Sequence, residues 1–343
     1  MRRDVEDAVI TDAVIKEAKR RARRRRWRYG GVAAVALSIL ALVAWDTPPT
    51  QGPPFGDAAG GGAGSSAATG AASEGGLGVF EPFRGWIFFA DGQGISAIDP
   101  ENPSSRRVVL ENPEGISSHV APVGWSADGS KLTLVDEGES GLWVMDSSGS
   151  LTHVPAMGGC CIFVYSNPLS PDGTTAIPWQ EGLGRAVWSA DGAASAVAVH
   201  EAVGRPDEVH TAAVLITDHE RGTTRQLDIP PVEVGHMAWS PDSEWLVVTA
   251  PGPRPRYWLA SNPADTRGLY VARVDGSDAR RISSGSYLAA AWSPDGTQIA
   301  ALTSGRELWV MNDDGSDPRS ILGRAVLPPE WTGIAWQPQA SQP

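Results

Sequence analysis

The sequence predicts an all-β fold, a β-propeller of about six blades, preceded by one N-terminal transmembrane helix. A short motif repeats along the chain, short apolar strands flank its copies, and a basic N-terminal segment precedes a long apolar run. Repetition every forty to fifty residues or so is typical of stacked supersecondary units such as propeller blades. The motif Trp-Ser-Pro/Ala-Asp-Gly begins at Trp125, Trp188, Trp239 and Trp292, with degenerate copies at Leu169 and Trp336.

The N-terminal residues are predicted to form a short cytosolic segment and a membrane-spanning helix. Residues 1–28 contain an amphipathic stretch and then, from Lys19 to Arg28, a dense run of positive charge. The uncharged residues 29–45, rich in Ala, Val, Leu and Ile, follow directly, which is the positive-inside pattern. At about 1.5 Å per residue this run spans about 26 Å, close to the roughly 30 Å hydrocarbon core of a bilayer. We therefore expect a single-pass protein of the cell membrane with a cytoplasmic N-terminus and an extracytoplasmic propeller.

A cleaved signal peptide is the alternative interpretation of this segment. Leu42 to Ala44 resembles a weak cleavage site before Trp45. The charged region that precedes the apolar run is, however, long for a signal peptide and includes several acidic residues. We favour an uncleaved anchor, and both interpretations export the propeller.

Residues 46–78 are predicted to be a disordered linker. Gly, Ala, Pro and Ser dominate this segment, and such a composition buries too little apolar surface to fold. The end-to-end distance of a flexible chain of this length is roughly 30 Å. We therefore expect the propeller to stand clear of the membrane surface.

Each copy of the motif is predicted to be a turn that closes a β-hairpin. Ser at the first turn position, Pro at the second, Asp at the third and Gly at the fourth form a type I turn signature. The repeat around Trp292 continues with a third strand, a second turn and a fourth strand. Its four predicted strands, a to d, are Leu288–Trp292, Gln298–Leu302, Glu307–Met311 and Arg319–Leu322.

The third strand and the turn after it recur in other repeats, as Leu142–Asp146 and as Leu269–Arg273. The succession of Trp-Ser-Pro-Asp-Gly, a strand, Leu-Trp/Tyr-Val and Asp-Gly resembles the TolB-like, WD-repeat-related β-propeller repeats. The resemblance covers residues 79–338 and leaves residues 339–343 as a tail. It implies the propeller fold and poorly specifies function, because propellers serve binding, scaffolding and hydrolase-associated roles.

The phase of the repeats predicts how the ring closes. The first repeat, from Arg84 onward, contains strands b, c and d but no strand a. The last repeat, at residues 332–336, contains strand a alone. Together they complete one blade, so we expect the C-terminal strand to close the ring and leave no open sheet edge.

The spacing of the motifs leaves two blade numbers open. Successive copies lie about 44, 19, 51, 53 and 44 residues apart. The short interval from Leu169 to Trp188 has room for one hairpin, at about residues 165–179, but not for four strands. We favour a six-position ring with five full blades and one reduced blade. Five blades with an inserted hairpin is the alternative.

The charge distribution argues against nucleic acid as a partner. Residues 1–30 hold 11 of the 28 Lys and Arg but 5 of the 40 Asp and Glu, so the rest of the chain is strongly acidic. Binding to phosphates requires a basic face. We interpret the acidic character as a contribution to solubility.

No cofactor, metal site or catalytic centre is predicted. Turn chemistry accounts for the motif aspartates, and the segment 312–317 resembles a calcium loop but has Gly323 where a bidentate Glu is required. His200 and His210 flank one loop without a third ligand at zinc spacing. The Gly-x-Ser-x-Gly nucleophile motif is absent from the sequence. We therefore do not expect an enzyme.

Cys160 and Cys161 are adjacent and are the chain's two cysteines. In an exported protein they can form a vicinal disulfide, join another chain, or stay reduced in packing. Labelling of free thiols in the unfolded, unreduced protein distinguishes these alternatives.

The connections between strands differ in length on the two faces of the predicted propeller. The a–b and c–d turns are short and uniform, whereas the b–c and d–a connections, which project from the opposite face, are long and variable. Variable loops on a rigid scaffold commonly carry binding residues, and Arg and large aromatic residues dominate binding hot spots. The alternative for the tryptophans is that they cap the core. The candidate binding residues are Arg254, Arg256, Tyr257, Trp258 and Trp331.

Three function classes are consistent with these features. We favour an anchored, exported scaffold whose loop-rich face binds a protein, a peptide or another cell-envelope ligand. The second class is a transmembrane regulator, similar to anti-sigma sensors, in which residues 1–28 bind a cytosolic partner. The third is a lactonase-like hydrolase that uses the propeller channel.

Overall fold

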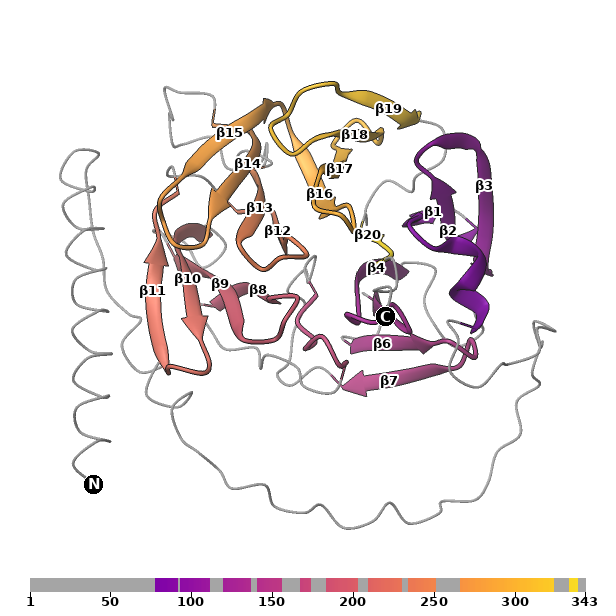
Figure 1. The fold of residues 1–343 in the computed structure, drawn as a ribbon, viewed down its shortest axis with the longest axis horizontal. Helices are drawn as coiled ribbons and strands as arrows, with labels where there is room; N and C mark the ends of the chain where they lie inside the picture. The colour runs from indigo at the N-terminus through magenta and orange to yellow at the C-terminus, as the bar shows by residue number, and fades with distance from the viewer. Residues whose placement is uncertain are drawn as a thin grey trace, which may run out of the picture.

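The computed structural model describes residues 78–91, 93–111, 120–136, 141–155, 167–173, 183–202, 209–229, 234–250, 266–323 and 333–338. Within these ranges the chain forms twenty β-strands and one 3₁₀-helix. The strands make five antiparallel sheets of four strands each. The sheets are arranged around a common centre, as the blades of a propeller (Figure 1). The prediction of an all-β propeller is therefore confirmed.

The blades are numbered in chain order, and the strands of each are given from the centre of the ring outward. Blade 1 contains β20 (Ile334–Trp336), β1 (Ile87–Asp91), β2 (Gly94–Asp99) and β3 (Asn102–Glu111). Blade 2 contains β4 (Val120–Trp125), β5 (Lys131–Asp136), β6 (Gly141–Asp146) and β7 (Leu151–Pro155). Blade 3 contains β8 (Leu183–Trp188), β9 (Ala194–Ala202), β10 (Val209–Asp218) and β11 (Thr223–Leu227).

The last two blades follow the same order. Blade 4 contains β12 (His236–Trp239), β13 (Trp245–Ala250), β14 (Gly268–Arg273) and β15 (Ala279–Ser284). Blade 5 contains β16 (Tyr287–Trp292), β17 (Gln298–Thr303), β18 (Leu308–Asn312) and β19 (Arg319–Leu322). In each blade the motif tryptophan ends the innermost strand.

Blade 1 closes the ring with strands from both ends of the propeller. The C-terminal β20 pairs with β1, so that Trp336 lies opposite Ile87 and Ile334 opposite Phe89. The indole Nε1 of Trp336 also donates to the carbonyl oxygen of Gly85, at 2.7 Å. The closure predicted from the phase of the repeats is confirmed by this pairing.

The 3₁₀-helix η1 (Gly78–Phe83) seals the junction beside this closing strand. The fully buried ring of Phe80 makes edge-on contacts with Phe88, at 6.2 Å between centroids, and with Trp125, at 4.9 Å. The amide of Val79 donates to the carbonyl oxygen of Ser147. The segment that leads into the propeller therefore joins blade 1 to blade 2.

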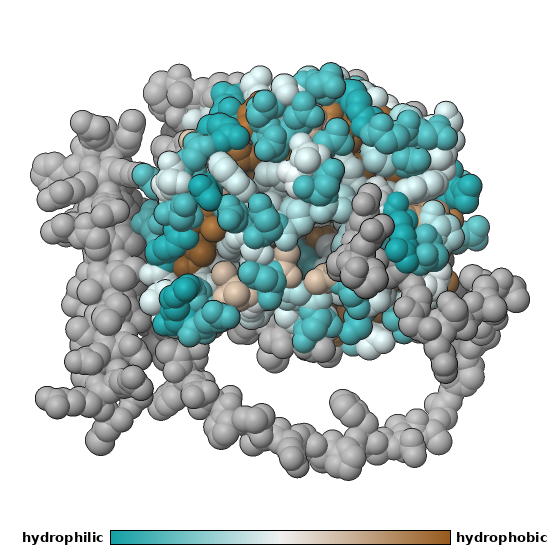
Figure 2. All heavy atoms as spheres, in the orientation of Figure 1, coloured by the Kyte–Doolittle hydropathy of each residue, from teal (hydrophilic) through white to brown (hydrophobic). Residues whose placement is uncertain are grey.

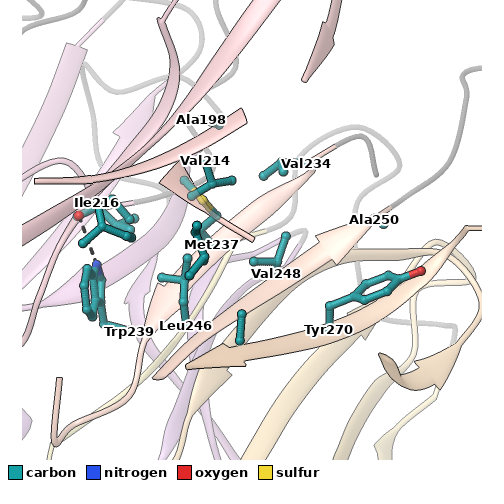
Figure 3. Packing of buried hydrophobic residues seen from close by; sticks show 14 residues of the cluster. Ala198, Val214, Ile216, Val234, Met237, Trp239, Leu246, Val248, Ala250 and Tyr270 are labelled. Atoms are coloured by element: carbon teal, nitrogen blue, oxygen red, sulfur yellow. Dashed lines mark hydrogen bonds between the residues drawn. The ribbon is translucent and has the colours of Figure 1, made fainter. Parts of the chain in front are cut away.

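Two of the motif tryptophans donate hydrogen bonds to the preceding blade. The indole Nε1 of Trp239 in blade 4 donates to the carbonyl oxygen of Val187 in blade 3, at 3.2 Å (Figure 3). In the same way Trp292 of blade 5 donates to Ala238 of blade 4, at 3.3 Å. Apolar side chains from both blades pack around these contacts, as Leu246 does beside Trp239. The tryptophan of the motif is thus a packing residue.

The described ranges form five four-stranded blades, and the sixth, reduced blade of the six-position ring that we favoured is not confirmed. The motif copy that begins at Leu169 is the reason for this difference. Its turn is present between blade 2 and blade 3, where Ala127 donates to the carbonyl oxygen of Pro171, at 2.9 Å. No four-stranded sheet within the described ranges contains this turn. The alternative of five blades agrees with the sheets observed, and most of the proposed hairpin at residues 165–179 lies outside the described residues.

Deletion of residues 330–343 should abolish cooperative folding of the propeller, because it removes a buried strand and exposes the edge of β1. Scanning calorimetry and size-exclusion chromatography should show loss of the unfolding transition or aggregation. Deletion of residues 339–343 is the matched control and should leave the transition in place. An unchanged melting temperature in the larger deletion would contradict the closure.

Candidate functional site

The propeller has two faces that differ in their connections. Since every sheet is antiparallel and the innermost strands all lead toward a motif turn, the a–b and c–d turns lie together on one face, here called the turn face. Contacts between the turns of neighbouring blades support this placement: the amide of Asp191 donates to the Ser243 hydroxyl, at 3.2 Å. The b–c and d–a connections lie on the opposite face, here called the loop face.

The motif aspartates on the turn face are used to build the turns. The Ser293 hydroxyl donates to Oδ1 of Asp295, at 2.6 Å, and the amide of Thr297 donates to the same atom, at 3.1 Å. Gly296 completes the turn with a φ of 73° and donates to the carbonyl oxygen of Ser293. The same arrangement recurs at Asp128 and Asp191. The turn chemistry predicted from the sequence is confirmed.

Local hydrogen bonds stabilise the ionised form of these carboxylates. Burial raises the pKa of Asp295, but the hydrogen bonds from Ser293 and Thr297 outweigh it and place the pKa below its usual value. At the c–d turn of blade 4, hydrogen bonds from the hydroxyl and amide of Ser277 lower the pKa of Asp275. Within the described ranges no group of three or more His, Cys, Asp or Glu side chains is placed to hold a metal ion. Because hydrogen bonds within their own turns hold them, Asp295 and Asp275 act as scaffold residues.

The surface is predominantly polar on the face turned to the viewer in Figure 2. Hydrophilic residues cover most of it, and hydrophobic residues show in small patches between them. The single large hydrophobic residue that is well exposed in the described ranges is Val108 of β3. An apolar docking patch is therefore not a feature of the described surface.

A polar group is buried on the loop face, where the innermost strands of blades 4 and 5 begin. His236 is 2% exposed, and its Nδ1 accepts a hydrogen bond from the amide of Ala290, at 3.4 Å. Thr249 lies opposite His236 on β13, is fully buried, and its hydroxyl has no hydrogen-bond partner in the part of the chain described. A buried hydroxyl without a partner is costly and marks a position that a water or a ligand can satisfy.

The longest b–c connection begins and ends beside this polar group. It leaves β13 after Ala250, and its far end is held firmly, because the Tyr270 hydroxyl donates to the carbonyl oxygen of Thr266, at 2.8 Å. Nη2 of Arg281 donates to the carbonyl oxygen of Arg267. The connection at residues 251–265 is therefore rooted in rigid, buried strands.

Sequence reasoning missed the polar group, because no repeat pattern marks it. His236 stands three residues before the motif Trp239, and the equivalent position before Trp292 is Ala289. The equivalent position before Trp188 is Arg185, so a polar residue there is not peculiar to blade 4 and marks no site. Thr249 carries no signal either, because threonine is common in strands.

A second polar cluster lies at the turn-face end of blade 3. Nε2 of His219 and the hydroxyl of Ser195 are 3.0 Å apart, and the imidazole is stacked on Trp188 with centroids 4.6 Å apart. Burial lowers the pKa of His219, an effect that the neighbouring Asp218 carboxylate opposes. The imidazole is therefore mainly neutral at pH 7, and the contact positions it against Trp188.

The binding residues predicted from the sequence lie outside the described residues, so the structure does not test whether they lie together. Arg254, Arg256, Tyr257 and Trp258 belong to the connection at residues 251–265, and Trp331 belongs to residues 324–332, all outside the described residues. Cys160 and Cys161 also lie outside them, as do the segments 1–28, 29–45 and most of 46–78. Among the described residues, no helix has the length and apolar character needed to span a membrane.

Comparisons with known proteins identify the fold. No family model matches the sequence, and no curated protein matches it either. Among solved structures, TolB from Acinetobacter baumannii matches with a TM-score of 0.50 and 16% identity, over 76% of this chain and 68% of that chain. A putative TolB from Agrobacterium tumefaciens matches with a TM-score of 0.40 and 15% identity, over 74% of this chain and 99% of that chain. The match to the Acinetobacter baumannii structure supports a TolB-like β-propeller fold, as the repeat motif indicated.

Replacement of Ser293 by Ala should make the protein less stable and less sensitive to acid. Because the pKa of Asp295 is depressed in the folded state, its contribution to stability is present above about pH 4 and is lost as the pH falls. Loss of a hydrogen bond worth about 1 kcal/mol should lower the melting temperature at pH 7 by about 2–4 °C. Melting temperatures measured from pH 7 to pH 3 test this.

The matched control is Ser320→Ala, at an exposed position of β19. It should follow the wild-type pH profile. The turn interpretation of Asp295 is refuted if Ser293→Ala melts like the wild type across this range.

Proposed function

We propose that this protein is a membrane-anchored, extracytoplasmic propeller that binds a protein, a peptide or another cell-envelope ligand on its loop face. The observation that carries the proposal is the connection at residues 251–265, which is rooted by Tyr270 and Arg281 beside the buried His236 and Thr249. Binding residues are commonly carried by loops that a rigid scaffold positions. TolB-like propellers are suited to such a scaffold role.

The contrast between the two faces supports this assignment. On the turn face, carboxylates such as Asp128 and Asp295 already accept hydrogen bonds from their own turns. A ligand there would have to compete with these local bonds. On the loop face, the hydroxyl of Thr249 is left without a partner in the described ranges. The loop face is therefore the better place for a ligand.

Five residues are proposed to supply the contacts with the ligand. Guanidinium groups bind carboxylates and aromatic faces, and large aromatic rings bury area at a low entropic cost. A mixed set of this kind suits a peptide or protein surface with acidic and apolar groups. The proposed contact residues are Arg254, Arg256, Tyr257, Trp258 and Trp331.

The anchor proposal rests on the sequence of the N-terminal segments. The basic residues before the apolar run at residues 29–45 favour a cytoplasmic N-terminus, and the linker at residues 46–78 is long enough to hold the propeller away from the lipid. In this arrangement the propeller meets ligands outside the cytoplasm, and residues 1–28 are available to a cytosolic partner.

Replacement of Arg254, Arg256 and Trp258 by Ala should weaken capture of the ligand from detergent-solubilised membranes by about tenfold or more. The reason is that hot-spot residues commonly contribute about 2 kcal/mol or more each to the free energy of binding. Quantitative pull-down with the full-length chain measures this. The matched control is the double variant Glu220→Ala/Asp313→Ala on the turn face, which should bind the ligand like the wild type.

A deletion of residues 1–18 separates this proposal from the regulator alternative. Loss of the captured partner in the deletion alone would assign binding to the cytosolic segment. Equal capture by the triple variant and the wild type would refute the loop-face proposal.

Protease added to intact cells should remove the C-terminal mass and spare an epitope placed within residues 1–28. The reason is that the apolar run holds the basic segment on the cytoplasmic side. Immunoblots against both ends measure the outcome, and cells lysed before digestion are the control. Protection of the propeller in intact cells would contradict the extracytoplasmic location.

A further inference from the structure

Each of the five sheets ends at the rim of the ring in an outermost strand, as blade 2 does in β7 (Figure 1). Within the described ranges, the far edge of this strand is not paired with another strand. Such an edge presents a row of amide and carbonyl groups to which another strand can add, and folded proteins commonly protect it with charged side chains and bulges. The outermost strands are β3, β7, β11, β15 and β19.

Four of the five edges carry this protection. The strands β3, β15 and β19 contain arginine, and each pairs with its inner neighbour through a shifted register. The register of β11 is regular, but its central residue is Arg225. Pairing of β11 with its own copy about its centre would place two guanidinium groups opposite one another, and like charges in that position are destabilising.

The outer edge of β7 has neither form of protection. Its sequence is Leu-Thr-His-Val-Pro, without a Lys, Arg, Asp or Glu. Its register with β6 has no shift from Leu151 to Pro155. The side chains of Thr152 and His153 are exposed. Among the described outermost strands, β7 is therefore the one that is both regular and uncharged.

The register of β7 shows which of its backbone groups point away from β6. The amide of Asp146 donates to the carbonyl oxygen of Ser150, at 3.0 Å. Hydrogen-bonded and non-hydrogen-bonded pairs alternate along an antiparallel ladder. The backbone groups of Leu151, His153 and Pro155 therefore point outward, toward the unpaired edge of the strand.

Two further observations agree with this assignment. His153 lies opposite Trp143 on β6, with ring centroids 4.8 Å apart, and side chains approach most closely in non-hydrogen-bonded pairs. Pro155 has no amide proton, and an edge strand tolerates proline where the amide would point away from the neighbouring strand. The ladder between β6 and β7 therefore loses no bond at Pro155, and the carbonyl oxygen of this residue is an acceptor on the outer edge.

We propose that β7 pairs with β7 of a second copy of this chain, antiparallel about a twofold axis at His153. In this pairing the amide and the carbonyl oxygen of His153 bond with those of the partner subunit's His153. The amide of Leu151 donates to the carbonyl oxygen of Pro155 of the partner subunit, so the missing proline amide is not needed. Each of these bonds forms in both directions by symmetry, and the two propellers share one continuous sheet.

A second copy fits this edge better than a charged peptide does. β7 offers no charged side chain that could select an acidic or a basic strand. Its own sequence, in contrast, meets itself without like charges, and its β-branched residues Thr152 and Val154 suit a paired strand. A twofold axis uses the same patch on both subunits, which is the commonest arrangement in homo-oligomers.

The pairing leaves the rest of the molecule accessible. β7 lies at the rim, between the turn face and the loop face, so both faces stay open in the dimer. One pair of short strands buries little area, and small interfaces are typical of weak, transient complexes. We therefore expect a reversible dimer whose population depends on concentration. The proposal does not depend on the loop-face ligand.

Disulfide trapping tests the pairing in the purified full-length chain with Cys160→Ser and Cys161→Ser. Under mild oxidation, His153→Cys should give a disulfide-linked dimer, because residue 153 faces its own copy and Cα atoms of such a pair lie about 5.5 Å apart. Non-reducing gels and mass spectrometry measure it. The matched control is Thr152→Cys, which is also exposed. Its copy lies diagonally across the axis at roughly 7–8 Å, so this variant should stay reduced.

Sedimentation velocity from low to high micromolar concentration gives a second readout that needs no cysteine variant. The full-length wild type should show a concentration-dependent dimer. His153→Lys should remove this dimer, because two ammonium groups would lie opposite one another. His153→Gln adds no charge and should dimerise like the wild type. Melting temperatures of both variants, compared with that of the wild type, verify that the propeller is folded.

Three results would overturn the proposal: equal cross-linking of the two cysteine variants, a monomeric wild type at every concentration, or a His153→Lys dimer as stable as that of the wild type. A disulfide that joins His153→Cys to a different protein, in place of one between two copies, would assign this edge to another partner and refute the second copy as its occupant.

Discussion

Every other feature of this fold depends on the packing of one blade against the next. A four-stranded sheet has two faces and cannot bury either one alone, so each blade depends on both neighbours. The motif tryptophan provides the contact: Trp239 and Trp292 fill the interface and donate to a carbonyl oxygen of the preceding blade. The ring must therefore close, and β20 closes it by pairing with β1. The contact between the rings of Phe80 and Trp125 packs the junction between blade 1 and blade 2.

This constraint also separates scaffold from function. The turns that hold neighbouring blades in register use Ser, Asp and Gly, and hydrogen bonds within each turn satisfy their polar atoms, as Asp295 illustrates. Such residues have few hydrogen-bonding positions left for a ligand. The connections on the loop face do not hold neighbouring blades in register, so their length and composition can vary without loss of the ring. The buried His236 and Thr249 lie on that side.

The sequence predicts those parts of the fold that are encoded locally. The turns around Asp128 and Asp295 follow from four adjacent residues, and the closure follows from the missing strand at one end and the extra strand at Trp336. The blade number was not predictable in this way, because it depends on what packs beside Leu169 and Trp188. His236 and the Ser195–His219 contact were missed for the same reason: they form between strands that no short pattern relates.

Blade 3 differs from the other blades in the row of residues opposite its motif tryptophan, Trp188, where it carries hydroxyl groups. The equivalent rows of blades 4 and 5 are apolar, as at Leu246 and Ile299. Blade 3 instead presents Ser195, Thr217 and Thr224, with polar atoms that tolerate water. The hydroxyls of Thr217 and Thr224 are 3.0 Å apart and satisfy one another. This face of blade 3 is therefore less apolar than the faces that line the other interfaces between blades.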